Sequence, residues 1–358
     1  MQKIGISQTI LYPIPSRYLR LSILFPGFLV LFLSDILLGS VHIPLRDALS
    51  VLAGGESEVK AWSYIIYNIR IPKALTATLA GAALSVSGLQ MQTLFRNPLA
   101  SPSELGISAG AALGTGFLIF AGGSAGGIIN LHRLGIGTSW LLALSASLGA
   151  ALIFSVLLVI SRFVRDHVVL LIVGLLLGTL TLSLTTIWQY YSKPEQLQAF
   201  ISWTFGSLGG VSGHQLTVLT CVSIIGILAS FSLSKTLNAL LLGEHNAATL
   251  GISILRARTF ILINTCILTG TVTAFCGPIG FIGIAVPHLT RSLLNTSNHL
   301  ILLPACCFTG AMLLLACDII AQLPGSGFVL PINVATSLVG APIVIWIILK
   351  MNNLRNSF

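Results

Sequence analysis

Charged residues are scarce in this sequence. Only 8% of its 358 residues are Asp, Glu, Lys or Arg, whereas 55% are apolar. The mean hydropathy is +0.96. An average soluble domain has about 25% charged residues, because water must solvate its surface. The scarcity of charge excludes a water-soluble fold and predicts a protein that is embedded in a lipid bilayer.

The sequence also lacks the motifs of an enzyme. It has no GxxxxGK[ST] phosphate-binding loop, no HExxH motif and no Ser/His/Asp set on its loops. The six cysteines lie in or beside apolar runs without the CxxC spacing of a zinc or redox site, so we interpret them as packing residues. We therefore predict no catalytic residue, no metal site and no cofactor bound by this chain.

Ionisable residues are rare inside the apolar runs. Asp35 and Asp318 lie towards the expected outer ends of two runs, and Glu104 lies at the inner mouth of a third. A transporter driven by a proton or sodium gradient would place such residues near mid-membrane, where each costs about 2.5–3.5 kcal/mol on insertion scales. We interpret the two aspartates as capping or paired residues, with a transport role as the alternative. Energy for transport should then come from another subunit.

The apolar runs predict an all-α fold with about ten membrane helices in a single domain, residues 1–358. A span needs about 20 mostly apolar residues, because a helix satisfies its own backbone groups in lipid. The first run is too long for a signal-peptide core and lacks an AxA-like cleavage site, so we expect it to stay as a membrane helix. The predicted spans are 19–39, 74–95, 105–120, 140–160, 168–188, 216–233, 259–275, 279–289, 300–320 and 334–349.

Basic residues predict the orientation, because cytoplasmic loops of membrane proteins carry an excess of Lys and Arg. With the N-terminus inside, six of the 18 Lys and Arg face outwards and the other twelve face the cytoplasm. The outer six are Arg46, Lys60, Arg70, Lys73, Arg133 and Lys193. We predict an inner-membrane protein with both termini in the cytoplasm. The net charge of +9 then reflects the excess of basic residues in the cytoplasmic loops, next to the membrane lipid. We therefore expect no nucleic-acid partner.

Two connections are longer than simple turns. The external one, 41–73, contains a short amphipathic stretch around 45–52, a Gly54-Gly55 break and a second stretch from Val59 to Lys73. The cytoplasmic one, 234–258, has leucines at 237, 240 and 241, which is the spacing of a helix with one apolar face. Long connections in compact proteins usually have a function, so both are predicted docking surfaces.

Small residues recur every fourth position in two of the spans. Ala77, Gly81 and Ser85 share one face of the second span, and Gly106, Gly110 and Gly114 share one face of the third. In lipid, helices associate largely through close backbone approach, which small residues permit. These faces are predicted helix contacts.

Several short motifs follow one another in a fixed order along the chain. They are Arg70-Ile-Pro-Lys73, Ala80 to Gly88, Arg96-Asn97-Pro98-Leu99-Ala100, Leu105-Gly106-Ile107, Gly243-Glu244 with Ala248 and Leu250-Gly251, Gly277 to Gly283, Val286-Pro287-His288 with Arg291, and Gly340-Ala341-Pro342. Together they resemble the permease family of binding-protein-dependent ABC importers for siderophores, haem and cobalamin, the FecCD type. The similarity extends from about Arg17 to Lys350.

The resemblance implies a type II ABC importer permease with ten helices in each of two copies, and we prefer a homodimer over a pair of homologues. It also implies two cytoplasmic ATPase subunits, which use the ATP, and an external substrate-binding protein. The segment between the sixth and seventh helices would seat in the ATPase, which assigns coupling to Gly243, Glu244, Ala248, Leu250 and Gly251. An amphipathic helix in a groove can transmit a rigid-body movement.

The resemblance also assigns two further sites. Arg70 and Lys73 would meet acidic residues of the binding protein, although Lys73 replaces an arginine and therefore lacks its bidentate fork. Gln322 stands where members can carry an arginine, Val329-Leu330-Pro331 where Glu-Leu-Pro often follows, and His245 where a second acid is common. The connection at Asn97, Pro98 and Leu99 would narrow the cytoplasmic exit as a gate, with a purely structural turn as the alternative. We expect Pro287 and His288 to end the short eighth helix.

The predicted function is that of the permease subunit of an importer that moves an iron chelate, siderophore or haem, into the cytoplasm by alternating access. A cobalamin importer of the same type is the alternative. A gradient-driven secondary transporter and a membrane-embedded enzyme or assembly scaffold are the other classes considered. The sequence contains no ligand set that identifies the chelate.

Overall fold

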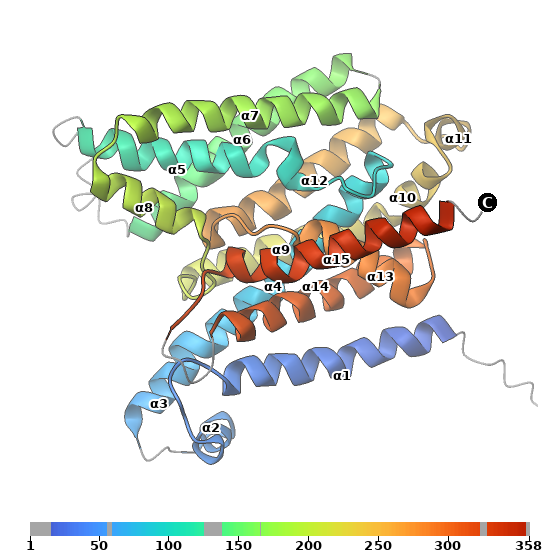
Figure 1. Ribbon diagram of the computed structural model, residues 1–358. Coiled ribbons are helices and arrows are strands. Elements are labelled where there is room, and N and C mark those ends of the chain that lie inside the picture. The colour runs from blue at the N-terminus through green and yellow to red at the C-terminus, as the bar shows by residue number, and fades with distance from the viewer. Residues whose placement is uncertain (1–15, 56–58, 125–137, 165, 323–327, 356–358) are drawn as a thin grey trace, which may run out of the picture.

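The computed structural model describes residues 16–55, 59–124, 138–164, 166–322 and 328–355, and every regular element within these ranges is helical (Figure 1). The long helices are α1 (Ser16–Leu37), α4 (Ile71–Leu94), α5 (Ile107–Ser124), α6 (Thr138–Phe163), α7 (His167–Tyr190), α9 (His214–Ser232), α12 (Ile254–Cys276), α13 (Ile282–Leu294), α14 (His299–Ala321) and α15 (Ile332–Arg355). The short ones are α2 (Leu45–Leu52), α3 (Lys60–Ile65), the π-helical turn η1 (Ile66–Arg70), the 3₁₀ turn η2 (Pro102–Leu105), α8 (Pro194–Thr204), α10 (Ser234–Leu241) and α11 (Glu244–Thr249).

Each predicted span lies on one of the long helices, so the all-α expectation is confirmed. Among the described residues, six helical segments are long and apolar enough to cross a bilayer, judged by length and composition: Lys60–Leu94, Ser139–Phe163, Val168–Tyr190, His214–Ser232, Ile254–Cys276 and His299–Ala321. The apolar parts of α1, α5 and α15 are shorter. With 13 residues, α13 is about 20 Å long, less than the hydrocarbon core of a bilayer.

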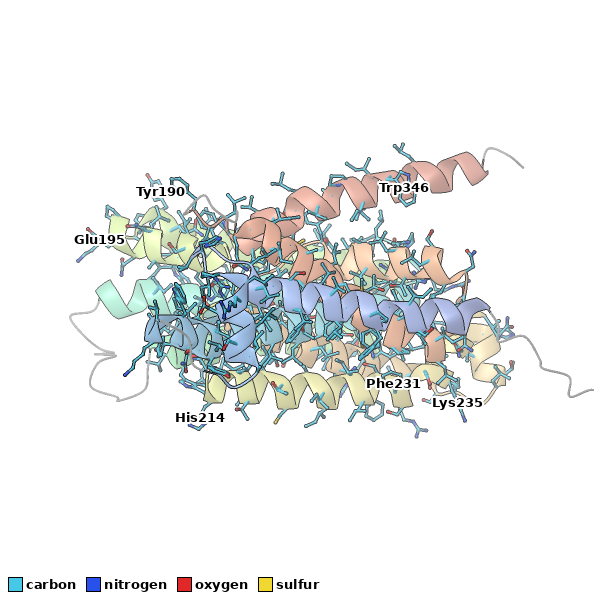
Figure 2. The ribbon with its side chains drawn as sticks, turned by 90° about the horizontal axis from the view of Figure 1, so that it is seen from below. Tyr190, Glu195, His214, Phe231, Lys235 and Trp346 are labelled. Atoms are coloured by element: carbon cyan, nitrogen blue, oxygen red, sulfur yellow. The ribbon has the colours of Figure 1, made fainter. Side chains whose placement is uncertain are left out.

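The long helices run side by side, and the two ends of the bundle carry different short elements. One end, which we call the α8 end, carries α2, α3 and α8 (Figure 1). The other, the α11 end, carries α10, α11, the start of α1 and the end of α15. Figure 2 shows Glu195 and His214 at the α8 end and Lys235 towards the α11 end. This arrangement agrees with the predicted topology, in which both termini and the 234–258 connection share one side. The helix α8 was not predicted.

The central helix of the bundle is α4. It packs against α9, α12, α13 and α14, and every residue from Ala80 to Leu94 is buried. A helix that is buried all round needs small side chains where its neighbours come close. The composition of this stretch, which is rich in Ala, Gly and Ser, therefore explains its central place.

Backbone contacts between glycines hold the α4 neighbourhood together. A Cβ at Gly81 would collide with the carbonyl oxygen of Gly310 on α14, and a Cβ at Gly88 would collide with that of Gly283 on α13. On the same face of α4, Ser85 Oγ donates a hydrogen bond to Cys306 O at 2.7 Å. The predicted small-residue face of the second span is confirmed as a helix contact.

The small-residue face of the third span is confirmed in the same way. A Cβ at Gly110 would lie 2.6 Å from Gly149 O on α6, and a Cβ at Gly114 would collide with Ser145 O on the same helix. Gly106 instead precedes α5 and lies against Gly178 of α7. These contacts bring α5 and α6 together.

An irregular segment precedes α13, and it displaces the predicted eighth span, 279–289, to Ile282–Leu294. Phe281 has a φ of 66°, which stops a helix from starting earlier. The irregular backbone finds partners inside the protein: Ser207 N donates to Cys276 O at 2.8 Å, and Gly280 N donates to Asn333 Oδ1 at 3.1 Å. Non-helical backbone at membrane depth requires such partners, because lipid offers none.

We predict that Gly88→Ala destabilises the protein, because the added methyl group meets the Gly283 carbonyl oxygen in a contact that neither backbone can relieve. Overpacking of this kind costs about 1–3 kcal/mol. The matched control is Gly270→Ala in α12, where the nearest atom to the new Cβ is Ala150 Cβ at 4.0 Å. That control should be neutral or stabilise by up to about 1 kcal/mol through helix propensity. Thermal unfolding of both variants in the same detergent measures the difference, and equal midpoints would contradict the prediction.

Candidate functional site

The predicted coupling segment forms two short helices at the α11 end. Leu237 and Leu240 of α10 are buried against the bundle as predicted, whereas Leu241, the third leucine of the predicted face, is 37% exposed. Past α10 the apolar side chains turn outwards, since Leu242 is 60% exposed and Leu250 is 65% exposed. Ala248 and Gly251 are exposed as well. The segment therefore presents an apolar surface away from the bundle.

Two predicted coupling residues organise the turn between α10 and α11. Gly243 is buried and has a φ of 103°, a conformation that other residues rarely adopt. Glu244 accepts a hydrogen bond from Arg258 Nη2 of α12 at 3.0 Å. The other nitrogen of the same guanidinium, Nη1, donates to Val164 O at 2.8 Å. Glu244 thereby attaches α11 to α12 and to the connection between α6 and α7.

The predicted gate residues form a tight turn after α4. Arg96 has a φ of 46°, and Asn97 Oδ1 accepts a hydrogen bond from Leu99 N at 2.9 Å. Pro98 O lies 2.8 Å from His288 Nε2. Because a carbonyl oxygen only accepts, His288 carries a proton on Nε2 and donates it. Leu99 is 43% exposed, so the turn presents an apolar tip.

The expectation that Pro287 and His288 end their helix is wrong, because α13 continues to Leu294. His288 instead holds the gate turn from inside α13. The sequence spacing gave no sign of this contact, since His288 and Pro98 are 190 residues apart.

The gate turn and the coupling segment are neighbours in space. A methyl group at Gly243 would lie 3.6 Å from Arg96 Nη1. α10 itself packs against both α4 and α14. The structure thus brings together two sites that were predicted separately.

At the α8 end, Arg70 is a structural residue that the sequence resemblance assigned to docking. Its side chain is only 6% exposed. The guanidinium donates through Nη1 to Ile36 O at 2.9 Å and Leu37 O at 2.8 Å, and through Nη2 to Val41 O. The last carbonyls of a helix have no partner within the helix, so Arg70 satisfies the end of α1. In this conformation three of the five N–H donors of Arg70 bind carbonyl groups of its own chain, and the side chain is almost fully buried.

Lys73 belongs to a buried ionic cluster that joins α1, α4 and α14. Its Nζ lies 2.9 Å from Asp318 Oδ2, and its side chain is 17% exposed. Gln322 Nε2 donates to Asp318 Oδ2 at 2.8 Å and to Asp35 Oδ1 at 3.1 Å. These contacts give both aspartates polar partners, which agrees with the pairing role that we expected for them.

Exposed cations at the α8 end lie on the short helices of the external connection. Arg46 of α2 and Lys60 at the start of α3 are exposed, as is Lys193 just before α8. Arg46 and Lys60 lie in the external connection 41–73, which was predicted as a docking surface, but neither was predicted individually as a docking residue. A short amphipathic helix exposes the residues opposite its apolar face, which is the signal that would have found Arg46.

Two open grooves lie on the flanks of the bundle. The first has a volume of about 310 Å³ between α5 and α7, and its mostly apolar lining also includes the polar residues Ser103, Glu104, Ser108, Thr179 and Thr204. Glu104, predicted at the inner mouth of the third span, lies in the wall of this groove.

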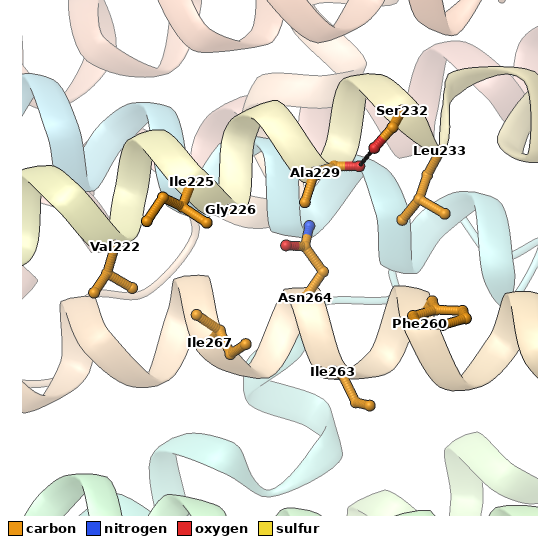
Figure 3. A pocket seen from close by; sticks show the side chains of 10 residues that line it. All are labelled: Val222, Ile225, Gly226, Ala229, Ser232, Leu233, Phe260, Ile263, Asn264 and Ile267. Atoms are coloured by element: carbon orange, nitrogen blue, oxygen red, sulfur yellow. Dashed lines mark hydrogen bonds between the residues drawn. The ribbon is translucent and has the colours of Figure 1, made fainter.

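The second groove has a volume of about 420 Å³ and lies between α9 and α12 (Figure 3). Its lining is apolar apart from Asn264 and Ser232, and its walls include Ile225, Phe260 and Ile267. The Asn264 amide donates to Ser230 Oγ at 2.8 Å. Such a lining suits contact with lipid chains.

No group of three or more His, Cys, Asp or Glu that could hold a metal ion occurs among the described residues. Of the six cysteines, four are buried, Cys307 is partly buried and Cys221 is exposed on α9.

Comparison with known proteins identifies the family. The model of the FecCD transport family matches residues 27–350. The vitamin B12 import system permease protein BtuC of Klebsiella pneumoniae subsp. pneumoniae is 40% identical over 289 residues, which cover 80% of this chain and 82% of that protein. The hemin transport system permease protein HmuU of Yersinia pestis is 34% identical over 331 residues, which cover 92% and 96%.

A solved structure agrees with these relatives. It is described as a metal-chelate type ABC transporter in an inward-facing conformation, and it superimposes with a TM-score of 0.78 at 29% identity. The match covers 92% of this chain and 99% of that chain. The helical bundle and these relatives define the membrane-spanning permease of an ABC importer, a transport component rather than an enzyme. The chain belongs to the FecCD transport family.

We predict that His288→Ala loosens the gate turn, because Pro98 O loses its donor from α13. One hydrogen bond contributes about 0.5–1.5 kcal/mol, so amide hydrogen exchange at Leu99 and Ala100 should accelerate by about threefold to tenfold. His288→Gln, which keeps an N–H donor, should restore most of the protection. His245→Ala, at an exposed position of the same end, serves as the control. Unchanged exchange in His288→Ala would contradict the assignment.

Proposed function

We propose that this chain is the permease through which an ABC importer moves an iron chelate, siderophore or haem, into the cytoplasm by alternating access. The match of the FecCD family to residues 27–350 carries the proposal. The hemin permease HmuU and the metal-chelate type transporter among the similar proteins support an iron chelate as cargo. The BtuC permeases support cobalamin as the alternative cargo of the same kind of permease.

The α11 end is proposed to face the cytoplasm and the ATPase subunits. The exposed apolar residues Leu242, Ala248 and Leu250 provide the surface that an amphipathic segment would insert into an ATPase groove. Gly243 and Gly251, both with positive φ, allow the sharp turns on either side of α11. Glu244 would pass the movement to α12 through Arg258.

The turn at Asn97, Pro98 and Leu99 is proposed as the cytoplasmic gate. It lies beside the coupling segment, as the contact between Gly243 and Arg96 indicates. Its exposed tip, Leu99, is apolar, and a second copy of the chain would place an equivalent tip opposite it. A homodimer is therefore the arrangement we favour.

The α8 end is proposed as the docking surface for the external binding protein. Of the two residues predicted for docking, Lys73 is partly exposed but paired with Asp318, and Arg70 supports the surface from below. Arg46 and Lys60 are exposed and free of salt bridges in the described part of the chain. We propose that they supply most of the positive charge for an acidic partner surface.

Reconstitution tests the function. The full permease, its ATPase and its binding protein in liposomes should accumulate a ferric siderophore or haemin on addition of ATP, at least tenfold faster than cyanocobalamin. Leu250→Asp, which puts a charge on the apolar surface, should lower ATPase binding at least tenfold, whereas Leu49→Asp at the α8 end should not.

The outcomes separate the candidates. Accumulation of cyanocobalamin alone would select the alternative cargo. Uptake that continues without the ATPase and stops with an ionophore would identify a secondary transporter. No ATP-dependent uptake of any of the three compounds would refute the proposal.

Charge reversal tests the docking surface. Arg46→Glu with Lys60→Glu should weaken binding of the substrate-binding protein by about tenfold or more at low salt, mainly through a slower association rate. The salt dependence of binding should also diminish, because fewer opposite charges meet. Lys235→Glu, at the α11 end, is the control and should leave this affinity unchanged. Equal affinities for the double variant and the wild type, measured by surface plasmon resonance, would place docking elsewhere.

A further inference from the structure

One fully buried histidine joins the coupling segment to the gate helix. His299, the first residue of α14, is 0% exposed. Its Nδ1 lies 2.8 Å from Asn238 Oδ1 on α10, and its Nε2 lies 2.8 Å from Thr93 Oγ1 on α4. A single imidazole ring thus bridges three helices at the α11 end.

The direction of each hydrogen bond follows from the neighbours. Asn238 Oδ1 also accepts from the backbone N of His299 at 2.9 Å, and Asn238 Nδ2 donates to Asn298 Oδ1 at 3.0 Å. The amide orientation is therefore fixed with its oxygen towards the ring, so His299 Nδ1 carries a proton and donates it. In the neutral ring, Nε2 then accepts the single proton of the Thr93 hydroxyl, for which Leu89 O, also 2.8 Å away, is the alternative acceptor.

Both ends of this contact lie next to a segment with a proposed role in transport. Asn238 lies in α10, which leads directly into Gly243 and α11. Thr93 lies in the last turn of α4, and its carbonyl oxygen accepts from Arg96 N at 3.4 Å, at the start of the gate turn. The ring therefore lies between the surface proposed to receive the ATPase and the turn proposed to close the exit.

A buried polar contact of this kind transmits displacement better than apolar packing does. A buried donor or acceptor that loses its partner inside the bundle has no water to replace it, which adds a cost that apolar contacts do not carry. Movement of α10 must therefore carry His299 and Thr93 with it, or leave polar atoms unpaired.

We propose that His299 is a positioning residue that couples movement of α10 and α11 to the gate turn at the end of α4. The inference rests on the proposed function, because the ATPase is the source of the movement. The contact between His299, Asn238 and Thr93 is independent of that proposal. The Glu244–Arg258 pair is a separate link, because it leads to the α6–α7 connection through Val164 and not to α4.

Two threonines on α4 give a matched test. Thr93→Val removes the hydroxyl that meets His299 while keeping the shape of the side chain. Thr76 is equally buried at the opposite end of the same helix, and its hydroxyl donates to Pro72 O within α4 at 2.8 Å, with no partner on another helix among the described residues. Thr76→Val therefore controls for the loss of a buried hydroxyl, and Thr93→Ser should restore the contact.

The measurement is the number of ATP molecules hydrolysed for each chelate molecule imported, in liposomes that contain the complete permease, ATPase and binding protein. Thr93→Val should raise this ratio at least fivefold, while Thr76→Val and Thr93→Ser stay within twofold of the wild type. If Thr93 had only a structural role, Thr93→Val would lower the yield of folded complex. The complexes that do fold would then hydrolyse the same number of ATP molecules for each chelate molecule imported as the wild type.

A second readout does not need cargo. In the wild-type complex, trapping the ATPase with ATP and vanadate should change amide exchange at residues 97–100, and Thr93→Val should abolish that change. If the wild-type complex neither imports chelate nor changes its amide exchange at residues 97–100 on trapping, the proposed function fails. If it does both and Thr93→Val behaves as Thr76→Val, the inference about His299 fails while the function stands. Should Thr93→Val not assemble, Asn238→Ala removes the contact from the α10 side and is judged by the same two readouts.

Discussion

Lipid supplies no hydrogen-bond partners, and this constraint shapes most of the structure. The central helix α4 carries polar residues at 90, 92 and 93, and each is bonded to a neighbouring helix. Gln90 Oε1 accepts from Thr265 Oγ1 at 3.0 Å, and Gln92 Oε1 accepts from Arg291 Nη1 at 2.7 Å. The polar groups of α4 therefore act as specific connectors, since any other register of the helices would leave them unpaired.

The same constraint explains why irregular backbone inside the bundle finds its partners in protein. The segment before α13 is tied to the first turn of α15 through Gly280 and Asn333. The end of α1 is satisfied by Arg70 rather than by water. Four buried hydroxyl groups have no hydrogen-bond partner among the described residues, and nothing in the fold explains them. They belong to Thr115, Ser223, Thr269 and Thr309.

The sequence predicted the helices well because their signal is local. Apolar run length and small-residue spacing are properties of one segment, and they placed α4, its Gly81 face and the Gly110 face of α5 correctly. The eighth span was displaced because its start depends on the backbone of Phe281, which hydropathy does not encode. The helix α8 was missed because its polar residues resemble those of a connecting loop.

The sites were less predictable, because their contacts join residues that are far apart in the chain. Resemblance assigned the gate and coupling roles to two separate segments, but it did not reveal that these segments lie close to each other. It assigned Arg70 to a partner, whereas the folded chain already uses that guanidinium for three of its own carbonyl groups. Neither His288 nor His299 has a neighbour in sequence that reveals its partner, which lies 190 residues away in one case and 206 in the other.

The glycine contacts also divide the molecule into helices that must move together and helices that can move separately. Where Gly81 meets Gly310 and Gly88 meets Gly283, backbone touches backbone, and sliding would drive carbonyl groups into Cα atoms. Helices α4, α13 and α14 must therefore turn together as a frame during any transport cycle. The ends of α4 and α14 that lie beyond these contacts, with Thr93 and His299, can still follow α10. Larger movements are then expected of sparsely packed helices such as α15, which packs mainly against α13 and α14. The hinges of this permease should therefore lie at the periphery of the bundle.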